Sequence, residues 1–220
     1  MKVLQLFVSI VPLAVSALLP VVNPVGSAVL FLGLVENADH ERRKRLARRI
    51  AVDMTLFLSI VLIVGTRILG FFGISMPVVQ VAGGFVLATM GWSLLNKPDA
   101  GRETSVHTPT SASNFEALAF YPLTFPLTVG PGCIVVTLTL SAHASKPELV
   151  ETIVAHLAVL VGIIIVAASV YLSYAYADRL TRRISVPMIE GIMRVISFIL
   201  VCIGGEIMWQ GIMNLIKSLH

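Results

Sequence analysis

Two short clusters of proline, glycine and polar residues carry the residue types that could bind a ligand in this chain. They read Pro20-Val21-Val22-Asn23-Pro24-Val25-Gly26-Ser27 and Thr124-Phe125-Pro126-Leu127-Thr128-Val129-Gly130-Pro131-Gly132. Each interrupts an apolar run of membrane length, where lipid cannot hydrogen-bond backbone groups that a helix has released. A break of this kind is tolerated where protein buries it or where it lines a wet cavity. The two clusters are therefore the first candidates for a binding site.

The first cluster has the chemistry of an anion site. A residue before proline is disfavoured in the α region, so we expect Asn23 to be extended and to cap a helix that begins at Pro24. The amides of Val25, Gly26 and Ser27 would then lack partners within the helix, at the positive end of its dipole. That arrangement suits a carboxylate. Gly26 has no side chain, so a small ligand could approach its backbone closely.

The second cluster offers the same groups with less bulk. Gly130, Pro131 and Gly132 would begin another helix, and Thr124 and Thr128 add hydroxyl groups. Carbonyls freed before each break accept hydrogen bonds and so suit an ammonium group. Both clusters together predict a site for a small zwitterionic substrate. The alternative is that these residues only kink packed helices, which is common in membranes.

Six long apolar stretches must position these clusters, and each reaches the roughly 20 residues that cross a hydrocarbon core. Only 13% of the residues are charged, about half the share found in globular domains. We therefore predict an all-α membrane protein with six transmembrane helices, of which the first and fourth are discontinuous. The stretches are Leu4–Val35, Leu46–Phe72, Pro77–Leu95, Leu118–Ala142, Leu149–Ala177 and Pro187–Leu215.

The order of motifs indicates an internal duplication. Three crossings in each half would insert the second copy upside down, and inverted repeats with matched broken helices point to a secondary transporter. We expect a first repeat at residues 1–96, a polar linker at 97–116 and a second repeat at 117–220. Besides the two clusters, the matching positions are Ile74-Ser75-Met76-Pro77 with Ile184-Ser185-Val186-Pro187, and Phe85, Leu87 and Gly91 with Phe198, Leu200 and Gly204.

Lysine and arginine are concentrated in the first, third and fifth loops, above all in the run Arg42–Arg49. By the positive-inside rule these loops are cytoplasmic, so both termini of this multi-pass protein are expected on the opposite, periplasmic or extracellular side. The basic residues share no single face, so no nucleic-acid partner is predicted, and the bilayer is the expected surrounding. A lipid-binding or nucleic-acid-binding patch at Arg42–Arg49 is the alternative to a plain topology signal.

Three further polar residues at membrane depth are candidates for a polar pathway or for a coupling ion. Glu206 is the clearest intramembrane carboxylate and is expensive to bury in its ionised form. It could carry a proton, bind a substrate amine, or be neutral and hydrogen-bonded. Asp53 and His156 lie near segment ends, where interfacial anchoring is the alternative. No motif with metal-ligand or catalytic spacing occurs, so we predict no metal, no cofactor and no enzyme activity.

The two clusters resemble those of the MarC family of prokaryotic inner-membrane proteins, as do Phe72-Gly73-Ile74-Ser75 with Pro77 and the patch Ala82-Gly83-Gly84. The resemblance covers essentially the whole chain and implies a six-helix fold similar to that of LysE-like exporters. It also implies transport of small neutral amino acids such as alanine, glycine and serine, driven by a gradient of protons or sodium. The family is named after an antibiotic-resistance operon, from which we infer no drug efflux.

The chain departs from that family pattern at three positions. Gln80 stands where relatives often have arginine, Val29 where a further proline is usual, and Glu206 where glutamine is expected. The change at Glu206 leaves substrate preference and coupling open. The leading hypothesis is a secondary transporter for small neutral amino acids. The alternatives are an exporter of ions, metals or other small metabolites and a scaffold without transport, and a homo-oligomer is compatible with the small-residue patches.

Overall fold

The computed structural model describes residues 2–35, 38–96, 119–183 and 185–218. In these ranges the chain is helical and contains no strand, which confirms the all-α prediction. The predicted linker at 97–116 lies outside the described residues. The elements are α1 (Lys2–Val22), α2 (Pro24–Leu34), α3 (His40–Phe71), α4 (Met76–Leu95), the π-helical η1 (Ala119–Thr128), α6 (Pro131–Ala144), α7 (Leu149–Ala175), α8 (Ala177–Arg183) and α9 (Val186–Lys217).

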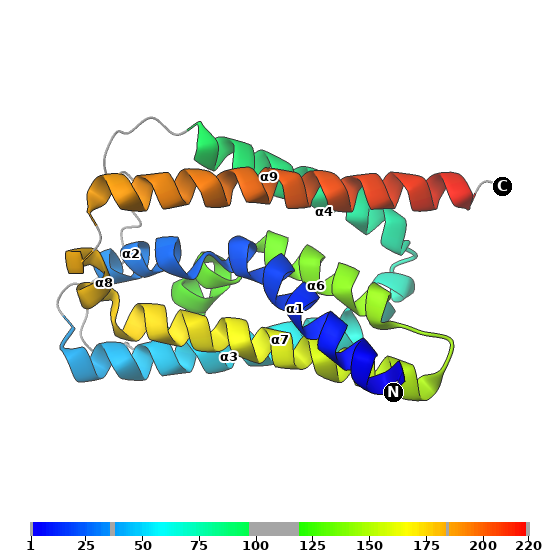
Figure 1. Ribbon diagram of the computed structural model, residues 1–220, viewed down its shortest axis with the longest axis horizontal. Helices are drawn as coiled ribbons and strands as arrows, with labels where there is room; N and C mark the ends of the chain where they lie inside the picture. Colours follow the sequence, from blue (N-terminus) through cyan, green and yellow to red (C-terminus); the bar gives the residue numbers. More distant parts are fainter. Residues whose placement is uncertain (1, 36–37, 97–118, 184, 219–220) are drawn as a thin grey trace.

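Five spans in the described residues are long and apolar enough to cross a membrane, or six if the bent pair η1–α6 counts as one. The first of them, Lys2–Leu34, combines α1 and α2, and the others are α3, α4, α7 and most of α9. The bounds lie close to the predicted apolar stretches because the length of an apolar run decides both. Both chain ends lie toward the same end of the molecule (Figure 1).

Helices α4 and α9 form a close antiparallel pair along one side of the molecule (Figure 1). Glycines spaced seven residues apart line the contact on both helices. A Cβ atom on Gly84 would lie 2.5 Å from the Met208 nitrogen and 2.6 Å from the Gly204 oxygen, and one on Gly91 would lie 2.8 Å from the Ser197 oxygen. Small residues let membrane helices approach to backbone contact, and dense van der Waals packing then holds them together.

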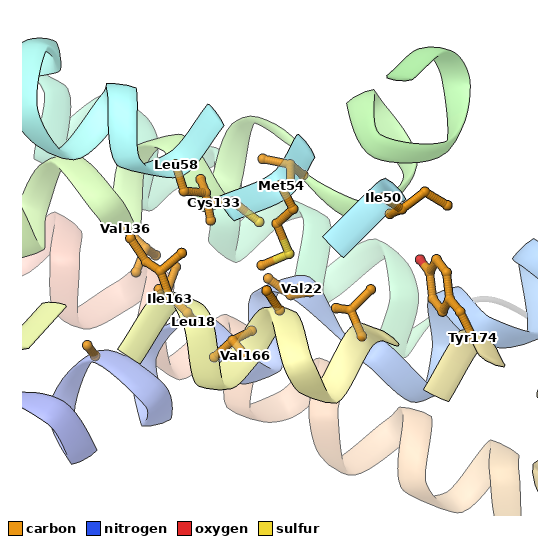
Figure 2. Close-up of a cluster of buried hydrophobic side chains, with 14 of the residues drawn as sticks. Leu18, Val22, Ile50, Met54, Leu58, Cys133, Val136, Ile163, Val166 and Tyr174 are labelled. Atoms are coloured by element: carbon orange, nitrogen blue, oxygen red, sulfur yellow. The ribbon is translucent and has the colours of Figure 1, made fainter. Parts of the chain in front are cut away.

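The remaining spans form a bundle in which α7 packs along both α1 and α3, and α6 packs beside α3. Figure 2 shows the apolar centre of this bundle, where side chains from α1, α3, α6 and α7 meet. Leu18, Met54, Leu58 and Ile163 are fully buried there. Both proline-rich clusters lie on this bundle and reach toward the α4–α9 pair.

Candidate functional site

The first cluster divides a single span without bending it sharply. Helix α1 ends at Val22 and α2 begins at Pro24, with Asn23 between them as the N-cap. The expectation of an extended Asn23 is wrong, since its backbone is left-handed at φ 48° and ψ 64°. The left-handed region also avoids the α region that proline disfavours, and asparagine tolerates it better than most residues.

In its left-handed conformation, Asn23 makes hydrogen bonds with several of the backbone groups around it. Its side-chain oxygen accepts the Gly26 N–H at 3.1 Å, and its carbonyl accepts the Ser27 N–H at 2.9 Å. Its own N–H donates to the Leu19 carbonyl at 3.0 Å. Two of the three amides predicted to be free therefore have partners in this conformation, and the expectation of an open three-amide seat is wrong. The side-chain nitrogen (Nδ2) of Asn23 lies 3.3 Å from the sulfur of Met193 on α9.

The second cluster bends the chain, and η1 and α6 meet at 69°. Inside η1 the backbone is non-helical at Tyr121 and Phe125, each of which precedes a proline. Gly130 is extended and caps α6, which begins at Pro131. The two clusters differ because the Asn23 side chain caps the helix after the first break, whereas Gly130 has no side chain to do so at the second, and Pro122 and Pro126 also interrupt η1.

The two clusters lie next to each other and both face the α4–α9 pair. A Cβ atom on Gly132 would lie 3.1 Å from the Val21 side chain of α1 and would overlap Leu87 of α4. A Cβ atom on Gly26 would lie 2.7 Å from the sulfur of Met193 on α9. The two glycines thus allow α6 to approach α4 and α2 to approach α9.

Tyr174, near the end of α7, lies between the two clusters. Its hydroxyl lies 2.8 Å from the Thr128 hydroxyl of η1. The Ser27 hydroxyl of α2 lies close by and donates its own hydrogen to the Val22 carbonyl at 3.0 Å. All three hydroxyl-bearing residues are buried, and the Tyr174 ring stacks on Phe31 with centroids 4.5 Å apart. Figure 2 shows the Tyr174 side chain with its hydroxyl directed into the bundle.

Sequence reasoning missed Tyr174. The apolar segment at Leu149–Ala175 carries two tyrosines, and Tyr171 instead lines the outer surface between α3 and α7. A tyrosine near the end of a membrane segment usually sits at the interface, where its ring is apolar and its hydroxyl is wet. The signal that could have identified Tyr174 is its helical phase, because Val166, Val170 and Tyr174 share one buried face of α7.

The two predicted threonines are buried in η1 and also bond within it. Thr124 donates its hydroxyl to the Ala119 carbonyl at 2.7 Å, and Thr128 donates to the Leu123 carbonyl at 2.6 Å. Each acceptor lies five residues earlier, which matches the wide turns of a π-helix. Thr128 alone also contacts Tyr174, so the structure connects one of the two threonines to the first cluster.

The three candidates for a polar pathway are not brought together. Asp53 of α3 pairs with Arg49 at 3.4 Å, and His156 of α7 contacts a carbonyl of its own helix. Glu206 of α9 is exposed and accepts a hydrogen bond from Gln210 at 2.9 Å. Among the described residues, no group of three histidine, cysteine or acidic side chains has the arrangement of a metal site.

Comparison with known protein sequences identifies the family of the chain. The model of the MarC family of integral membrane proteins matches residues 7–216. The chain belongs to the MarC family. Inner membrane protein MarC of Escherichia coli K12, of Shigella flexneri and of Shigella boydii are each 29% identical to it over 216 residues, covering 94% of this chain and 96% of theirs.

This MarC family member is thus a multi-pass protein of the inner membrane, as its apolar spans and the names of its relatives indicate. The match covers both clusters, Tyr174, α4 and all of α9 except its last residue. No solved structure matches the chain.

Proposed function

We propose that this MarC family protein is a secondary transporter of small neutral amino acids, which bind where the two clusters meet. The observation that carries the proposal is the buried Tyr174 side chain, whose hydroxyl lies 2.8 Å from the Thr128 hydroxyl of η1 and whose ring stacks on Phe31 of α2. One side chain thus connects the helices that contain the two clusters. Polar groups buried in a membrane protein are expensive and commonly mark a substrate pathway. Two helix starts beside this side chain supply the remaining groups that a zwitterion needs.

The carboxylate of the substrate would take the place of the Asn23 side chain. In the structure the side-chain oxygen of Asn23 already accepts the Gly26 N–H at the start of α2. A carboxylate oxygen is a stronger acceptor at the positive end of a helix dipole. Binding would therefore release the Asn23 carboxamide, which also contacts Met193 of α9. The first turn of α6, at Pro131 and Gly132, offers a second positive helix end nearby.

The ammonium group would use the hydroxyls and carbonyls of the same region. Thr128, Ser27 and Tyr174 each have an oxygen lone pair, and the Val22 carbonyl accepts the Ser27 hydroxyl at 3.0 Å. An ammonium group has three donors and no acceptor, so it matches this set. Other side chains already lie against Gly26 and Gly132, so little room is left beside them. This favours substrates with small side chains.

The α4–α9 pair would act as one rigid unit that moves against the bundle. Its backbone contacts at Gly84 and Gly204 bind the two helices tightly, whereas its contacts with the clusters run through flexible side chains at Met193 and Leu87. The proposed inverted repeat makes α4 and α9 equivalent third helices of the two halves, and rocking of such units is how alternating access works. A proton or sodium gradient is the proposed driving force.

The test is exchange of radiolabelled glycine and alanine in proteoliposomes that contain the full chain. We expect Gly26→Leu and Gly132→Leu to reduce exchange by at least tenfold, because their side chains would displace Met193 and Leu87, which lie against the two clusters. Matched controls are Gly33→Leu and Gly205→Leu, since a Cβ atom at either position meets no atom within 4 Å. Equal exchange by all four variants would refute the site, and exchange absent from the wild-type protein would refute the substrate class.

A further inference from the structure

A groove of about 610 Å³ lies on the surface between α3 and α7, away from the residues of the proposed transport site. Small side chains create it, because Ala51 of α3 and Ala167 and Ala168 of α7 leave the space between the two helices unfilled. Its volume is within the range of about 300–1,000 Å³ that is usual for ligand pockets. Its lining is mostly apolar, so its occupant in a membrane has a hydrocarbon part.

The two ends of the groove differ in chemistry. Arg48 and Tyr171 lie at one end, and Leu56 and Ile164 lie at the other. Eight residues separate Arg48 from Leu56, a rise of about 12 Å along α3 at 1.5 Å per residue. That distance approaches one leaflet, which is half of a hydrocarbon core about 30 Å thick. The groove thus has the length of much of an acyl chain and a cationic group where the chain would meet its headgroup.

The basic residues at the start of α3 fall into two groups. Four have an acidic partner within 4.0 Å; these are Arg42 with Asp39, Arg43 with Asp178, Lys44 with Glu41 and Arg49 with Asp53. In the part of the chain that the structure describes, no acidic side chain pairs with Arg45 or Arg48. These two lie three residues apart and so share the helix face that continues into the groove at Val52.

We infer that the groove is a binding site for an anionic phospholipid of the leaflet that meets the start of α3. One acyl chain lies between α3 and α7, and the phosphate lies against Arg45 and Arg48. Two arginines without acidic partners select a lipid with net negative charge over a zwitterionic one, since basic residues at a membrane surface attract anionic headgroups. The charge distribution of the loops predicts that this leaflet is the cytoplasmic one. The inference does not depend on the transported substrate.

The experiment is native mass spectrometry of the delipidated full-length protein, titrated with phosphatidylglycerol or phosphatidylcholine of identical acyl chains. We expect phosphatidylglycerol to bind more tightly. Arg45→Gln and Arg48→Gln should each weaken its binding about fivefold, which is the factor that about 1 kcal/mol per basic residue gives. Arg67→Gln is the matched control, because Arg67 is exposed near the opposite end of the same helix. It should leave binding unchanged.

A second set of variants tests the hydrocarbon part of the site. Ala168→Leu and Val52→Trp should fill the groove and weaken both lipids alike, whereas Ala82→Leu on the exposed face of α4 should have no effect. All of the altered side chains are exposed, so folding is expected to persist, and gel filtration would verify it. The inference would be overturned if both lipids bound equally well and neither arginine variant changed their binding. Binding of phosphatidylglycerol unaffected by either groove-filling variant would also overturn it.

Discussion

The hydroxyl of Tyr174 lies 2.8 Å from the hydroxyl of Thr128, and this contact joins α7 to η1 inside the bundle. The ring of the same tyrosine stacks on Phe31 of α2, so one side chain connects the helices that contain the two proline-rich clusters. This stacking fixes the ring and so holds its hydroxyl in place. The proposed site is therefore built by three helical elements rather than by the two clusters alone.

Replacing Tyr174 with phenylalanine removes the hydroxyl contact with Thr128 while keeping the stacked ring. Thr128 and Ser27 would keep their bonds to backbone carbonyls, so we expect a modest loss of stability of about 0.5–1.5 kcal/mol. Exchange of labelled alanine should fall much more than stability does, by roughly tenfold. Tyr121→Phe is the matched control, because the Tyr121 side chain is exposed. Full exchange by Tyr174→Phe would show that the hydroxyl contact has no role in transport.

Gly26→Ala should weaken substrate binding through Met193. Its Cβ atom would lie 2.7 Å from the Met193 sulfur and would overlap the Asn23 carboxamide, both of which are movable side chains. We therefore expect the fold to persist and the affinity for alanine, measured by thermal shift, to fall about tenfold. Met193→Ala should restore part of the affinity in the double variant, because neighbouring changes couple. Strictly additive effects of the two changes would contradict this contact.

Gly84→Ala should destabilise the protein by about 2–4 kcal/mol, in the range of severe core changes. Its Cβ atom would meet backbone atoms, the Met208 nitrogen at 2.5 Å and the Gly204 oxygen at 2.6 Å, and α4 and α9 would have to separate. Gly205→Ala, next to Gly204, meets no atom within 4 Å and should be neutral or slightly stabilising. Thermal unfolding in detergent measures the stability of both variants. Equal melting temperatures would show that the α4–α9 contact is not tight.

Glu206→Gln should leave amino-acid exchange within about twofold of the wild type, since ordinary surface substitutions have small effects. Glu206 is exposed on α9, and Gln210 donates a hydrogen bond to it that a glutamine could still accept. The measurement is exchange in proteoliposomes at several pH values. A complete loss of exchange would favour the alternative in which this carboxylate carries a proton or binds an exported ion.

The helical class and the positions of the spans follow from the sequence because they depend on local apolar length. The start of α2 at Pro24 is also a local matter, since proline suits the first turn of a helix. The backbone of Asn23 was predicted incorrectly. Two conformations avoid the clash with the following proline, and the contacts of the asparagine side chain decide between them.

The helical phase of Tyr174 could have placed it on the buried face of α7, but its contacts with Thr128 and Phe31 depend on tertiary packing. Tyr171 precedes it by one turn on the same helix, yet it faces the outer groove rather than the bundle. The role of Glu206 was left open by the sequence, and in the structure this residue is exposed and lies apart from the two clusters, where it accepts a hydrogen bond from Gln210. Local spacing can show which face of a helix is buried, but the residues that this face meets depend on how the helices pack.

The most direct test of the central claim is a thermal-shift measurement of the purified protein against all twenty amino acids. A ligand that binds only the folded state stabilises the protein and raises its melting temperature. At a ligand concentration one hundred times the Kd, the free energy of unfolding increases by about 2.7 kcal/mol. The account predicts stabilisation by glycine, alanine and serine, little by leucine, lysine or glutamate, and loss of the effect in Gly132→Leu. Stabilisation by none of the twenty, or an unchanged effect in that variant, would contradict a small-amino-acid site at the two clusters.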